Sequence, residues 1–209
     1  MKKISLLLFF FVTCFSFVYA QQEAEGYLKE AQEYIKAKNL KEARLSIQQA
    51  LANINTFTGK EILKVLPAEF NGMKPSGDYD DYINLYPANG DGGMSVSRTY
   101  KKDKEDYKNY FVITVYVTSI GTNAIKDYLN DPTRLNPKSE KIIKLSNGKK
   151  TLGRFYSDSE EYKSGSLDIP FNDFYISIFG YGTESKEDAL IKCASKIDFE
   201  KLRKAAGEQ

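Results

Sequence analysis

The sequence predicts an α+β protein in which an N-terminal helical hairpin precedes an antiparallel sheet with helices packed on one face. Three observations lead to this fold class. Apolar residues recur at three- and four-residue steps over residues 22–54, as they do on amphipathic helices. Short β-rich segments separated by turn signals fill residues 94–181. Helical periodicity returns over residues 123–130 and 185–197.

Residues 1–20 have the three parts of a cleavable secretory signal. A short basic head is followed by an apolar run over residues 4–17 and by a small residue, Ala20, at the exit. The run is short for a membrane span, which takes about 20 apolar residues. No small residue directly precedes Cys14, which disfavours a lipid anchor. We expect export to the periplasm or the extracellular space, with no transmembrane span after cleavage; a retained anchor and lipidation are the alternatives.

Composition removes several classes of function. The chain has 30 basic and 28 acidic residues, and two lysines leave with the predicted signal, so the mature protein would carry no formal net charge. Nucleic-acid binding needs a basic surface and is not expected. The sequence has no histidine, which excludes Ser-His-Asp and Cys-His catalysis and His-ligated metal sites. We expect a non-enzymatic protein without a cofactor.

Cysteine usage predicts that the mature protein has no internal disulfide. Only Cys193 would remain after cleavage, and a single cysteine has no partner within the chain. Its apolar neighbours at helical spacing, Leu190 and Ile197, indicate a buried and inert thiol.

The first predicted element after the signal is a pair of helices that breaks at residues 37–39. A short break predicts antiparallel packing. The pair resembles a single tetratricopeptide repeat, and the positions that carry the likeness are Ala31, Tyr34, Leu40, Ala43, Ile47 and Ala50. The resemblance implies that the alanines let the helices approach and that the larger residues fill between them. Such repeats bind partners in a groove of about three units, and the sequence has one, so packing on the neighbouring domain is an alternative to binding.

A third, short helix is predicted after this pair. Thr58 and Glu61 have the spacing of a capping box, and Pro67 would end the helix. Residues 21–66 therefore form the predicted helical region.

Residues 67–93 are rich in glycine, proline and aspartate, and only Ile83–Leu85 reads as a short strand within them. A long irregular segment in a compact protein is usually functional or mobile. Alternate carboxylates can bind a hard cation, and tyrosines favour interfaces, although the regular calcium-loop spacing is absent. The metal assignment stays open. The candidate binding residues are Asp78, Tyr79, Asp80, Asp81, Tyr82, Tyr86 and Asp91.

Residues 94–209 are predicted to form the antiparallel α+β domain. The expected strands cover residues 94–100, 110–118, 142–145, 151–156, 166–169 and 174–179, and the expected helices cover 123–130 and a segment that Ser185 would cap. Asn147-Gly148 predicts a hairpin with a type I′ turn. Because of this turn, the Ser-x-x-Lys spacing of Ser146 and Lys149 is not taken as catalytic.

The order of these elements over residues 93–202 resembles the Mog1/PsbP type of α+β sandwich found in exported bacterial proteins. The ending carries much of the likeness, with the strand 176–180 followed by a helix and by residues 197–199. The fold family has no shared active site, so the resemblance implies an accessory or binding role.

The sequence therefore predicts an exported binding or accessory module that contacts a protein partner in the cell envelope. The first alternative is binding of a small ligand or a divalent cation by the acidic, Tyr-rich loop. The second is a hydrolase that uses paired carboxylates and needs no histidine. The oligomeric state is left open.

Overall fold

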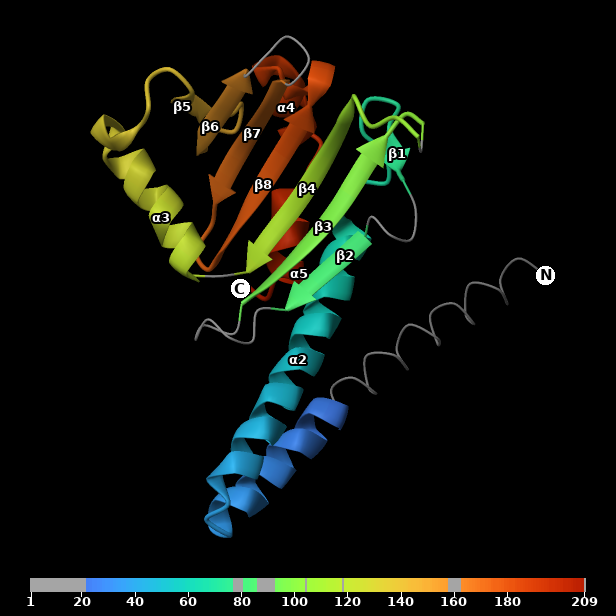
Figure 1. The fold of residues 1–209 in the computed structure, drawn as a ribbon, viewed down its shortest axis with the longest axis vertical. Helices are drawn as coiled ribbons and strands as arrows, with labels where there is room; N and C mark the ends of the chain where they lie inside the picture. Colours follow the sequence, from blue (N-terminus) through green and yellow to red (C-terminus); the bar gives the residue numbers. More distant parts are fainter. Residues whose placement is uncertain are drawn as a thin grey trace, which may run out of the picture. The chain divides into compact units, whose positions relative to one another are not determined.

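The computed structural model describes residues 22–76, 81–85, 93–103, 105–117, 119–157 and 163–208. The chain divides into two compact units, Met1–Thr58 and Gly59–Gln209. The predicted fold class is confirmed, because a helical hairpin is followed by an antiparallel sheet with helices (Figure 1). The predicted signal segment and Cys14 lie outside the described residues.

The first unit contains a helix over residues 22–36 and the first part of α2 (Leu40–Val65). Lys38 takes a left-handed conformation with φ of 58°, and the Asn39 N–H donates to the Tyr34 carbonyl at 2.8 Å. The Asn39 side chain then accepts the Glu42 N–H at 3.4 Å. The predicted break at residues 37–39 is confirmed, since these bonds end one helix and begin the next.

Small residues form the seam of this hairpin. Those buried are Ala24, Ala31, Ala43, Ser46 and Ala50. The Asn53 amide also donates to the Glu23 carboxylate of the other helix at 3.4 Å. The alanines pack as predicted. The expectation that the larger residues fill the space between the helices is wrong, because most of them are exposed.

No separate third helix forms. α2 continues through Thr58 to Val65, so Thr58 lies inside a helix. There the backbone N–H groups already bond to carbonyls one turn earlier, and a capping box has no free group to bind. The last turns of α2 belong to the second unit, where Ile62 and Leu66 are buried in the core of the sheet.

The second unit is built on an eight-stranded sheet in the order β1-β3-β4-β8-β7-β6-β5, with β2 also paired to β3. Each pairing between these strands is antiparallel. The chain passes from β4 to the far edge at β5 and returns strand by strand to β8, which pairs with β4 (Figure 1). The strands are β1 (Lys74–Pro75), β2 (Asp81–Leu85), β3 (Met94–Lys101), β4 (Tyr110–Val117), β5 (Glu140–Lys144), β6 (Lys150–Ser157), β7 (Lys163–Pro170) and β8 (Phe174–Tyr181).

The predicted hairpin at Asn147-Gly148 joins β5 to β6, with a different turn from the one expected. Gly148 has φ of 83°, whereas Asn147 has no positive φ. A type I′ turn needs positive φ at both central residues. The Gly148 N–H donates to the Leu145 carbonyl at 2.8 Å, and the Leu145 N–H donates to the Lys149 carbonyl at 2.9 Å. This pattern is that of a type I turn followed by a glycine bulge.

One face of the sheet carries the main hydrophobic core. Alternate residues of β4 and β8, such as Phe111 and Ile176, pack there with Leu190 and Cys193 of α4 (Glu187–Ala194) and Leu202 of α5 (Phe199–Ala205). Figure 1 shows α4 and α5 behind the strands. The remaining helix, α3 (Ser119–Asn130), contacts β6, β7 and β8 and is followed by the short helix η1 (Pro132–Arg134).

The C-terminal helical region differs from the prediction at its start. Ser185 ends the short helix η2 (Gly182–Ser185), and its hydroxyl donates to the Gly182 carbonyl at 2.7 Å. Ser185 therefore does not cap α4, which begins after Lys186 without a side-chain cap. η2 lies close to the sheet, because a Cβ added at Gly180 would meet the Glu184 carbonyl oxygen at 2.1 Å.

Candidate functional site

The hairpin of the first unit exposes a set of large apolar side chains. We call Leu28, Ile35, Leu40, Ile47, Leu51 and Ile54 the apolar strip; their exposed fractions run from 37% for Leu51 to 69% for Leu40. Single exposed apolar residues are normal on protein surfaces, whereas grouped ones mark interaction sites. The grouping therefore matters more than the exposure of any one residue.

The residues of the apolar strip lie on the same side of the hairpin. An α-helix turns by about 100° per residue. This rotation places Leu40, Ile47, Leu51 and Ile54 within about 60° of one another on α2. We followed each helix from its N-terminus and compared the direction of the strip residues with that of the seam residues. The strip is rotated about the helix axis in the same sense in both helices, by about 40° in the first helix and by about 70° in α2. Because the two helices are antiparallel, rotation in the same sense brings both halves to one side.

The acidic, Tyr-rich loop lies largely outside the described residues. This holds for Asp78, Tyr79, Asp80, Tyr86 and Asp91. Asp81 and Tyr82 are the first residues of β2, in register with Arg98 and Ser97 of β3. The strand begins two residues before the predicted Ile83, so these two positions belong to the edge of the sheet. The binding role of the loop stays a prediction.

In the part of the chain that the structure describes, no group of three or more carboxylate and cysteine side chains could hold a metal ion. No helix among the same residues is long and apolar enough to cross a membrane.

A charged cluster links β5, β6 and β7. The Arg154 guanidinium pairs with Glu140 at 3.1 Å and with Asp168. Asp168 is only 4% exposed, and its burial raises the pKa of the carboxyl, while a hydrogen bond with Ser177 and the charge of Arg154 act in the opposite direction. Both carboxylates are engaged by one guanidinium, an arrangement that fixes three strands relative to one another.

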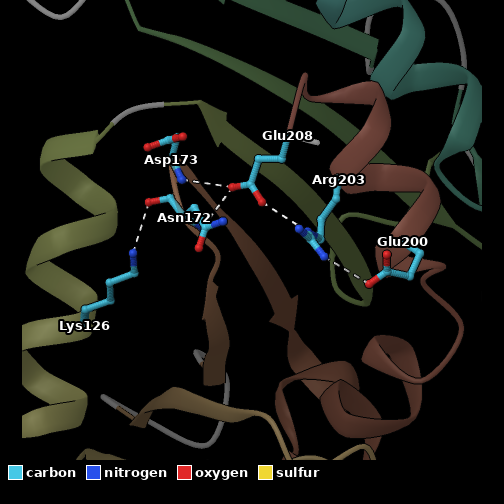
Figure 2. A network of polar contacts seen from close by, with 6 residues as sticks. All are labelled: Lys126, Asn172, Asp173, Glu200, Arg203 and Glu208. Atoms are coloured by element: carbon cyan, nitrogen blue, oxygen red, sulfur yellow. Dashed lines mark hydrogen bonds and ion pairs between the residues drawn. The ribbon is translucent and has the colours of Figure 1, made fainter.

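A second polar network ties the end of the chain to the β7–β8 turn, as Figure 2 shows. One oxygen of Glu208 accepts the backbone N–H groups of Asn172 and Asp173 at 2.8 and 2.9 Å. Its other oxygen accepts the Arg203 Nε–H at 3.1 Å. Lys126 of α3 donates to the Asn172 carbonyl at 3.0 Å. The turn is thus held from both sides, by α3 and by the C-terminal segment.

Cys193 is a buried free thiol, as predicted. Burial raises the pKa of this thiol, with a smaller contribution from the charge of Glu184. A thiol that stays protonated is a poor nucleophile, so this residue belongs to the core.

The apolar strip and both polar networks were not predicted from the sequence. The apolar strip is part of the periodicity that predicted the hairpin, but the same periodicity also contains the seam alanines, and no signal separates the two sets. The network at Glu208 joins residues about 35 positions apart along the chain, and nothing in the local sequence signals it.

A scan against protein-family models, a search of curated proteins and a search of solved structures each found no match to this chain. The resemblances to a tetratricopeptide repeat and to the Mog1/PsbP sandwich stay predictions. The helical hairpin followed by an antiparallel sheet with helices is what the structure shows.

Proposed function

We propose that this protein is an exported, non-enzymatic binding module that contacts a protein partner in the cell envelope through the apolar strip of its hairpin. The observation that carries the proposal is the exposure of six large apolar side chains on one side of the hairpin, while its seam is closed by alanines. The predicted secretory signal supports the location.

Burying the apolar strip against a partner is favourable in free energy compared with leaving it exposed to water. Complete burial of one Leu or Ile side chain contributes roughly 1.5–3 kcal/mol. The strip residues are about half exposed, so covering them would gain a substantial fraction of that value at each position. An apolar helix or an apolar patch of a partner has the matching chemistry, as when an amphipathic helix lies along a groove.

The test is co-purification from an envelope extract of the native host, with three baits. The first is the wild-type mature protein, and the second carries Ile47→Lys and Leu51→Lys in the strip. The third carries Gln48→Lys and Gln49→Lys, which add the same charge at exposed positions of the same helix. We expect one protein to be retained by the wild type and the Gln variant and lost with the strip variant.

The proposal is contradicted if the captured protein is retained equally by all three baits. Light scattering after size exclusion provides a second check. If the wild type is a dimer and the strip variant is a monomer, the strip mediates self-association. The proposal that it binds a different protein is then wrong. Circular dichroism of both variants should match that of the wild type, since each changed residue is exposed.

A further inference from the structure

Two adjoining hollows lie beside the β5–β6 turn. The larger one, of about 290 Å³, has polar walls that include Lys149, Arg203, Asn147 and Asn172. The smaller one, of about 160 Å³, has apolar walls that include Leu145, Ile191 and Ile197. Asn147 and Phe199 line both hollows. A ligand that is polar at one end and apolar at the other would match this pair.

The two cationic side chains of the larger hollow differ in their ion pairing. Arg203 is paired with Glu200 at 3.3 Å and with Glu208 at 3.1 Å. The Lys149 ammonium lies 3.5 Å from the centre of the Phe171 ring. Within the described ranges of the chain, no ion pair is formed by Lys149. Lys149 is therefore the cation that could pair with a ligand.

The Lys149 side chain is half-buried, and this burial lowers the pKa of the ammonium group, while the charge of Glu208, which also lines the hollow, acts in the opposite direction. A carboxylate placed beside a partly desolvated ammonium offsets the cost of its burial. Asn147 and Asn172 add side-chain amides, which can donate hydrogen bonds to a carboxylate oxygen.

We propose that this site binds a small carboxylic acid with an apolar chain, with the carboxylate on Lys149 and the chain in the hollow between the β5–β6 turn and helices α4 and α5. The chemistry is that of a short or medium-chain fatty acid. The site is built from residues of the second unit and the apolar strip from residues of the first, so this proposal does not depend on the proposed partner binding.

The test is calorimetric titration of the mature protein with straight-chain carboxylates from butyrate to octanoate. Each added methylene that enters an apolar hollow should raise the affinity by about fourfold, until the hollow is full. Hexanol and hexylamine have the same number of carbons but no carboxylate, and we expect them to bind at least about tenfold more weakly than hexanoate because they cannot form an ion pair with Lys149.

Three variants locate the head group. Lys149→Met should weaken hexanoate binding by about tenfold or more through loss of the charged partner. Lys150→Met removes the same charge from the next residue, which is exposed, and should leave binding unchanged. Glu200→Gln removes an exposed negative charge from the wall of the hollow and should strengthen binding by about twofold.

The proposal is overturned if hexanol binds as tightly as hexanoate, or if Lys149→Met binds like Lys150→Met while both melt at the wild-type temperature. A peptide that ends in a leucine carboxylate distinguishes the source of the ligand. The free acid should bind at least as tightly as this peptide, and a tenfold preference for the peptide would overturn the assignment to a fatty acid.

Discussion

The hairpin and the sheet unit place their large apolar side chains in opposite ways. In the sheet unit, many large apolar residues are fully buried, among them Phe70, Tyr100 and Phe111. In the hairpin, the buried residues are alanines and one serine, and the leucines and isoleucines are exposed. The sheet unit therefore has a large apolar core of its own, whereas the hairpin leaves its leucines and isoleucines exposed.

The hairpin and the sheet unit also differ in how much apolar area their contacts bury. A seam of alanines lets two helices approach closely, and it buries little area per residue. Ring contacts such as that between Phe70 and Tyr100, at 4.8 Å between centroids, bury far more. We expect the hairpin to open at lower free energy than the sheet, because local stability follows buried apolar contact.

The largest expected effect is in the core of the sheet. Phe111→Ala should lower the free energy of unfolding by about 3–5 kcal/mol, because it removes a fully buried ring. Urea denaturation followed by circular dichroism measures it. Tyr107→Ala is the control; its side chain is 71% exposed, and the change should stay within about 0.5 kcal/mol. Equal losses in the two variants would show that the described core does not hold the unit together.

A pair of glycine substitutions should have opposite signs in the two units. A Cβ at Gly180 would meet the Glu184 carbonyl oxygen, so Gly180→Ala should cost roughly 1–3 kcal/mol by overpacking. Gly26 lies in the first helix with no atom within 4 Å of an added Cβ, so Gly26→Ala should stabilise the hairpin by about 0.5–1 kcal/mol. Thermal melts of both variants check the signs, and a stabilising Gly180→Ala would contradict the close contact with η2.

The alanine seam should be sensitive to added volume. Ala50 is 1% exposed, and Ala50→Leu should cost roughly 1–3 kcal/mol because it separates the two helices. Amide hydrogen exchange over residues 22–58 reports this loss locally. Gln49→Leu adds a similar side chain at an exposed position and serves as the control. Comparable exchange in both variants would show that the seam is not tightly packed.

A smaller effect concerns pH and is confined to the sheet unit. Burial raises the pKa of Asp168 above its unfolded value. The folded state therefore holds a proton more tightly, and the contribution of Asp168 to stability falls as pH rises through the folded pKa. We take the free energy of unfolding of the wild type minus that of Asp168→Asn. We expect this difference to decrease as pH rises from 3.5 to 7.

Urea titrations at half-unit steps of pH test this expectation. Asp173→Asn removes an exposed aspartate from the same unit and serves as the matched control variant in the same titrations. An increase of the Asp168 difference with pH would mean that pairing with Arg154 outweighs burial.

The smallest effect is expected for the most exposed residue of the apolar strip. Leu40 is 69% exposed, so Leu40→Gln should change the free energy of unfolding of the isolated protein by no more than about 0.5 kcal/mol. The same denaturation assay measures it. A loss close to that of Phe111→Ala would mean that the strip is part of a core and not a free surface.

The sequence predicted the type and order of most elements because periodicity and turn residues are local signals. The break at residues 37–39 and the hairpin at Gly148 follow from such signals. The prediction of a new helix at Thr58 was wrong. A capping box forms only where a helix begins, and α2 continues through that position. The prediction that Ser185 caps α4 was also wrong, because Ser185 is the last residue of the short helix η2, which precedes α4.

The candidate sites were harder to predict, because they depend on contacts between distant residues. The position of Lys149 beside a turn follows from the sequence, but its contact with the Phe171 ring depends on how two hairpins pack together. The exposure of Ile47 and the burial of Ala50 could not be separated, because both lie on the apolar stripe of one helix. The predicted loop site at residues 78–91 has its two described members, Asp81 and Tyr82, in an edge strand.

The burial of Cys193 makes the predicted mature protein suitable for site-specific labelling. The raised pKa and the buried position of this thiol keep it unreactive toward maleimides and other thiol reagents. A cysteine introduced at Gln48 would then be the one reactive position, and a fluorophore attached there would report the arrival of a partner on the neighbouring strip. The predicted mature protein can carry such a probe without first replacing Cys193.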